Sequence, residues 1–151
     1  MFASLPLHPL VVHVPVLLLP VSAVCTVILA VKPSLINKWA AALTVLVAVG
    51  FGGAFLATQT GEELEDSLRE GGEKISETLH DHAELGEQAR TLAFGLLVIV
   101  AAMWILGRKD YAWKRSWMMP VLRVLGVVVA IAVGYFTYRT GHTGATSVWN
   151  D

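Results

Sequence analysis

Residues 5–31 read LPLHPLVVHVPVLLLPVSAVCTVILAV, an almost unbroken apolar stretch without a single Asp, Glu, Lys or Arg. A helix needs about 20 apolar residues to cross a hydrocarbon core of ~30 Å, so this stretch predicts a membrane-spanning helix. No Lys or Arg precedes it and no A-x-A-like cleavage site follows it. We therefore interpret it as a retained span rather than a signal peptide.

Three further apolar segments follow, at 39–58, 92–106 and 118–138. The segment at 92–106 is short, but it reaches span length if it extends back to residue 85. The chain is 55% hydrophobic and 15% charged, whereas soluble domains carry about a quarter charged residues. We predict an all-α integral membrane protein, a four-helix transmembrane bundle forming one domain over 1–151. The expected spans are about 5–31, 39–58, 85–106 and 118–138.

The charges between the spans are distributed unevenly. The short segments 32–38 and 107–117 are basic, whereas the long segment 59–88 is mainly acidic. Short basic loops stay in the cytoplasm, so both termini and the acidic segment are expected to be extracytoplasmic. Four tryptophans would form an aromatic belt at the cytoplasmic boundary: Trp39, Trp104, Trp113 and Trp117.

The acidic segment between the second and third spans is expected to be a helical loop. Leu64 and Leu68 are an i, i+4 pair that could lie on the membrane surface. Gly71–Gly72 should break this helix, and a second helical run should begin near Ile75 and continue into the third span. No internal repeat is evident in the sequence.

Prolines in the first span and glycines in the second predict local departures from regular helix packing. Pro15 and Pro20 should kink the first helix and free backbone carbonyl groups near His13. The glycines of segment 50–53 are interpreted as a point where another helix approaches closely.

The histidines are the strongest candidates for function, and the predicted topology places all of them on the outer side. They are His8, His13, His80, His82 and His142. A histidine below the headgroups needs a reason, because it is polar and titrates near neutrality. For His13 the alternative is a hydrogen bond to a carbonyl freed by a proline. For the others the alternatives are a solvated surface residue or a helix-end residue.

Neutral imidazole binds iron, copper and zinc, and one deep histidine per helix is how helical bundles hold haem. The single cysteine, Cys25, and the absence of a C-x-x-C-H motif exclude c-type haem attachment and iron–sulfur clusters. Glu77 and His80 form one Glu-x-x-His motif without a second, which is weak support for a dinuclear site. The net charge of −1 gives no reason to expect nucleic acid. No catalytic motif is evident, and enzyme activity is left open.

Four segments together resemble a bacterial membrane-protein family known as domain of unknown function 2231. They are LHPLVVHVP at 7–15, TGEELE at 60–65, HAELGE at 82–87 and YRTGHTGA at 138–145. The resemblance covers essentially the whole chain and implies a four-helix protein of the bacterial plasma (inner) membrane. Some members are fused to redox modules such as Rieske domains, which implies a setting of electron transfer. The shared histidines of the family fall on His8, His13 and His82, whereas the position of His142 is often not histidine.

Our first hypothesis is a b-type haem protein that transfers electrons at the extracytoplasmic face. His13 and His82 would be the axial ligands, with His142 as a substitute and His8 as a neighbour on the propionate side. Arg90 would pair with a haem propionate.

Two alternatives remain. One is copper or zinc bound by His8, His13 and His82 with a glutamate, and with His142 as a further candidate ligand. The other is a cofactor-free subunit of a larger membrane complex. The expected partners are the lipid bilayer and a redox protein at the extracytoplasmic face, without nucleic acid; a homo-oligomer is left open.

Overall fold

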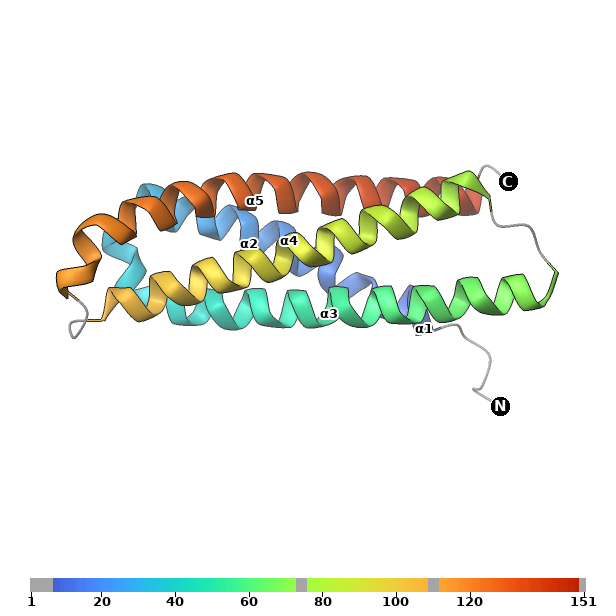
Figure 1. Ribbon diagram of the computed structural model, residues 1–151, viewed down its shortest axis with the longest axis horizontal. Helices are drawn as coiled ribbons and strands as arrows, with labels where there is room; N and C mark the ends of the chain where they lie inside the picture. Colours follow the sequence, from blue (N-terminus) through green and yellow to red (C-terminus); the bar gives the residue numbers. More distant parts are fainter. Residues whose placement is uncertain (1–6, 73–75, 109–111, 150–151) are drawn as a thin grey trace.

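The computed structural model describes residues 7–72, 76–108 and 112–149, and every regular element in these ranges is a helix (Figure 1). In chain order the elements are α1 (Leu7–Val11), α2 (His13–Val31), the short 3-10 helix η1 (Pro33–Leu35), α3 (Ile36–Glu70), α4 (Glu77–Gly107) and α5 (Ala112–Trp149). Four helical stretches are long and apolar enough to cross a membrane: His8–Val31, Pro33–Glu70, Glu77–Gly107 and Ser116–Thr146. The predicted all-helical fold with four spans is confirmed.

The four long helices pack as a closed ring. Helix α2 contacts α3 and α5, and α4 contacts the same two helices. Each long helix contributes a completely buried apolar side chain to the shared core, namely Leu19, Val47, Leu96 and Val133. The diagonal pairs of the ring are therefore α2 with α4 and α3 with α5.

The outer surface of the bundle carries many large apolar side chains. Val24, Val45, Val98 and Ile131 each expose between 52% and 65% of their surface. Large apolar side chains exposed along a whole helix are unfavourable in water and favourable in lipid. This surface therefore agrees with a protein embedded in a bilayer.

The acidic segment 59–88 is largely helical, as expected, but most of it belongs to the two long helices rather than to a separate loop. Helix α3 continues without interruption to Glu70, and α4 already begins at Glu77. The reason is local: Glu62 to Glu70 contains strong helix formers, including the i, i+4 ion pair between Glu65 and Arg69. The helix ends where Gly72 takes a positive φ of 80°. The predicted break at Gly71–Gly72 and the run of the next helix into the third span are both confirmed, whereas the expected start near Ile75 lies outside the described residues.

The two ends of the bundle differ in charge. One end, called here the acidic end, contains α1, the C-terminal parts of α3 and α5 and the N-terminal part of α4 (Figure 1, right). The carboxylates of Glu62 to Glu70 and of Glu77 to Glu87 lie there. The opposite end contains η1, the C-terminal part of α4 and the N-terminal part of α5 (Figure 1, left).

The first span is interrupted at Val12, directly before His13. Pro15 is the cause, because it has no N–H to bond the carbonyl of Val11 and its ring crowds that same carbonyl. Helix α1 accordingly ends at Val11, four residues before Pro15. This interruption lies beside His13, where the sequence predicted a kink, and α2 then runs on through Pro20.

Two of the three glycines in segment 50–53, Gly50 and Gly53, allow α2 to approach α3 closely. A Cβ atom on Gly53 would lie 2.7 Å from Cγ1 of Val14 and 2.9 Å from Cδ of Pro15, both on α2. A Cβ atom on Gly50 would lie 2.9 Å from Cδ2 of Leu19. Gly52 has nothing within 4 Å of the same position.

We expect Gly53→Ala to lower the stability of the bundle by about 1–3 kcal/mol, the usual cost of overpacking against rigid neighbours. Val14 is branched at Cβ and Pro15 is a ring, so neither can swing away. Gly52→Ala is the matched control and should be neutral or stabilising by about 0.5–1 kcal/mol. Thermal unfolding of the two variants in detergent measures the difference, and equal midpoints would contradict this packing.

Candidate histidine site

His8 enters the bundle from α1 and is anchored on α3. Its Nδ1 lies 2.9 Å from the carbonyl oxygen of Ala57 and 3.4 Å from Oγ1 of Thr60. A Cβ atom on Gly61 would lie 3.2 Å from Cε1 of this imidazole. The missing side chain of Gly61 therefore lets the ring lie close against α3.

His82 is anchored in the same way, from α4 onto α5. Its Nδ1 lies 2.9 Å from the carbonyl oxygen of Thr140 and 3.4 Å from Oγ1 of Thr143. A Cβ atom on Gly144 would lie only 2.7 Å from Cε1 and 3.0 Å from Nδ1 of the ring. This contact is tighter than that at Gly61.

The two anchors are equivalent residue by residue. In each, the accepting carbonyl is followed three residues later by a threonine and four residues later by a glycine: Ala57, Thr60 and Gly61 on α3, and Thr140, Thr143 and Gly144 on α5. Each helical hairpin thus contributes one histidine and one anchor. This internal correspondence was missed in the sequence, although a Thr-Gly pair near the end of both α3 and α5 could have indicated it.

These hydrogen bonds determine which nitrogen is available in each ring. A backbone carbonyl can only accept, so the Nδ1 atoms of His8 and His82 must both carry the proton and donate it. In the neutral ring the lone pair then resides on Nε2. Metal-ligating histidines are commonly oriented by this same Nδ1–H to carbonyl hydrogen bond.

The two imidazoles meet inside the acidic end of the bundle. Their ring centroids are 6.1 Å apart and their planes are perpendicular. An imidazole nitrogen binds a metal at about 2.0 Å, so two rings on opposite sides of one metal have centres roughly 6 Å apart. The 6.1 Å between the centroids of the histidine pair, His8 and His82, is close to that separation.

The other predicted ligands do not join this pair. His13 is exposed on the outer face of α2, and His142 is exposed on α5 with its ring 6.1 Å from that of Tyr138. His13 follows His8 by five residues, which turns it roughly 140° away around a helix axis. The pairing of His82 is therefore with His8 rather than with the predicted His13. Within the described ranges no group of three or more His, Cys, Asp or Glu side chains comes together as a metal site.

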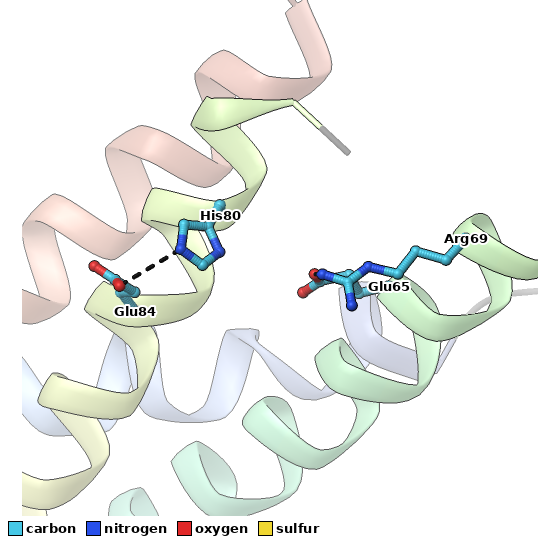
Figure 2. Close-up of polar contacts among 4 residues, drawn as sticks. All are labelled: Glu65, Arg69, His80 and Glu84. Carbon is cyan, nitrogen blue, oxygen red and sulfur yellow. Dashed lines mark hydrogen bonds and ion pairs between the residues drawn. The ribbon is translucent and has the colours of Figure 1, made fainter. Parts of the chain in front are cut away.

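Two further residues considered from the sequence lie outside the pair. His80 is on the exposed face of α4, where Nε2 is 3.5 Å from a carboxylate oxygen of Glu84; Figure 2 shows this contact together with the Glu65–Arg69 pair on α3. Arg90 donates from Nη1 to Oγ1 of Thr58 at 3.0 Å and lies over the ring of Phe55. Among the described residues, no hydrogen bond joins Arg90 to either imidazole.

Comparison with known proteins identifies the chain at the level of a family. No curated protein and no solved structure gives a significant match. One family model matches residues 4–151, that is, the whole of the bundle described above. The chain belongs to this family, DUF2231, which is described as a predicted membrane protein.

Proposed function

We propose that this protein binds one b-type haem between His8 and His82 and transfers electrons at the extracytoplasmic face of the bacterial plasma membrane. One observation carries the proposal: two imidazoles from different helical hairpins lie 6.1 Å apart, each with Nδ1 held by a backbone carbonyl. In both rings Nε2 is then the nitrogen that remains for a metal.

Haem is favoured over other metal groups because of the number of ligands that it needs. The porphyrin supplies four nitrogen ligands, so the protein has to provide only two, and the histidine pair is such a set. Zinc sites usually take three or four protein ligands. A single copper ion is the second candidate, because imidazole suits copper and the ring spacing fits any metal held between two imidazoles.

The residues of the pair have defined tasks in this proposal. His8 and His82 would hold the iron from opposite sides, and the carbonyls of Ala57 and Thr140 would keep their rings oriented. Two axial histidines leave no coordination position open for a substrate, which favours electron transfer over chemistry at the metal. The exposed carboxylates of Glu62, Glu63, Glu84 and Glu87 surround the same end. They suit a redox partner with a basic surface.

A reduced-minus-oxidised absorption spectrum of the purified chain, expressed with ample haem, tests the proposal. We expect the sharp visible bands of a six-coordinate b-type haem and one haem per chain. A flat difference spectrum would overturn the haem assignment. Elemental analysis of the same sample would then support copper if one equivalent is present, or the cofactor-free subunit if none is.

A further inference from the structure

A hollow on the outside of the bundle lies between α3 and α4, and neither histidine of the pair lines it. Its volume is about 310 Å³, and it is lined by Phe51, Phe55, Arg90, Thr91 and Phe94. Phe55 and Phe94 expose 43% and 53% of their surface. The hollow therefore opens toward the surroundings of the bundle rather than into its core.

Arg90 is the only charged residue that lines this hollow. Among the described residues no carboxylate lies within ion-pair distance of it; its polar contact is the hydrogen bond to Thr58. A guanidinium group has five N–H donors in a planar fork, so most of them remain available. The geometry of this fork matches a phosphate group better than a single point charge does.

The position of Arg90 along the bundle corresponds to a membrane boundary. On α4 it is the last charged residue before an uncharged stretch, 91–107, that reaches the other end of the helix. On α3 the residues 39–61 are likewise uncharged, and Thr58 lies near the end of that stretch. The guanidinium is thus level with the change from apolar to polar surface, the depth of lipid headgroups.

Besides Arg90 and Thr91, the hollow is lined by the aromatic rings of three phenylalanines. The rings of Phe51 and Phe94 are 5.5 Å apart, and those of Phe51 and Phe55 are 6.4 Å apart. Phe55 also lies beneath the guanidinium, with Cζ of Arg90 5.9 Å from the ring centroid. A cation at the headgroup level above an apolar surface is complementary to a molecule with an anionic head and a hydrocarbon tail.

We propose that this hollow is a binding site for an anionic phospholipid of the leaflet at the acidic end. Arg90 binds the phosphate through its free N–H donors, with Thr91 beside it, and an acyl chain lies along Phe51, Phe55 and Phe94. The proposal goes beyond haem binding and does not depend on it.

Native mass spectrometry of the purified full chain, titrated with phosphatidylglycerol in detergent, tests the site. We expect one tightly bound phosphatidylglycerol whose affinity falls roughly tenfold in Arg90→Gln, the effect of losing one charge-assisted contact. Arg90→Lys should lose part of the affinity because it keeps the charge but not the fork. Phosphatidylcholine, which carries no net charge, should bind wild type and Arg90→Gln about equally.

Arg139→Gln is the matched control. Arg139 is on α5 near the same end, hydrogen-bonds the hydroxyl of Tyr135 at 2.9 Å and lies 5.9 Å from that ring, but does not line the hollow. Its replacement should leave phosphatidylglycerol binding unchanged. Equal losses in the two variants, or equal wild-type affinities for the two lipids, would overturn the proposal. Haem content measured on the same samples separates this role of Arg90 from a contact with a haem propionate, because only the latter role would lower it.

Discussion

Replacement of either His8 or His82 by alanine is expected to abolish haem binding, whereas His13→Ala and His142→Ala should retain it. The first two side chains form the pair with ring centroids 6.1 Å apart, and the other two are exposed on different helix faces. Loss of an axial ligand should weaken haem binding more than about 100-fold, since even loss of an outer-shell partner typically costs roughly 10- to 100-fold.

The measurement is the haem-to-protein ratio and the reduced-minus-oxidised spectrum of each variant, with the helical content checked by circular dichroism. The exposed histidines are built-in controls because they are the same residue type at the same end of the bundle. Full haem content in His8→Ala would remove this residue from the ligand set. Loss of haem in His13→Ala alone would restore the pairing expected from the sequence.

The second large effect is expected at Gly144. An added methyl group would lie 2.7 Å from Cε1 and 3.0 Å from Nδ1 of His82, so Gly144→Ala must push the imidazole away from the carbonyl of Thr140. The ring would lose both its orientation and its distance to His8. We expect haem affinity to fall roughly 10- to 100-fold, as when an outer-shell contact of a ligating histidine is removed.

Gly141→Ala provides the control within the same helix, because nothing lies within 4 Å of a Cβ atom at that position. The two substitutions have the same intrinsic effect on helix propensity, so a difference in haem content between them reports the contact with His82. Haem titration of both variants, alongside their thermal midpoints, makes the comparison. Equal haem affinities would show that His82 does not need the close approach at Gly144.

The acidic segment shows that a helix can be predicted correctly while its connection to the neighbouring span is not. The helical character of Glu62 to Arg69 and the break at Gly71–Gly72 were predicted from helix-forming residues and glycines, which act locally. Whether such a helix is separate or continues a span depends on whether the chain leaves the helix between 58 and 62, where Gly61 is the one residue of a type that commonly ends helices. The chain has no proline or turn there, so α3 simply continues to Glu70.

The choice of histidines shows a different limit. Val11, Val12 and Val14 flank His13, and hydrophobic neighbours in sequence suggest a buried side chain. In a membrane protein the outer face is also apolar, so such neighbours do not distinguish a side chain facing the bundle from one facing lipid. Only the angle around the helix and the identity of the packed helices make that distinction, and these place His8 beside Ala57 and leave His13 outside.

By itself the sequence determined the four spans and the clustering of histidines and acids toward one end, because apolar length and charge distribution are properties of the chain alone. It also determined the family, through the four segments that carry the resemblance. The tertiary structure decided which histidines meet, that both are held by equivalent carbonyl, threonine and glycine residues, and that Arg90 faces a hollow at the surface. These depend on contacts such as that between His82 and Thr140, 58 residues apart, which arise only when α4 and α5 pack together.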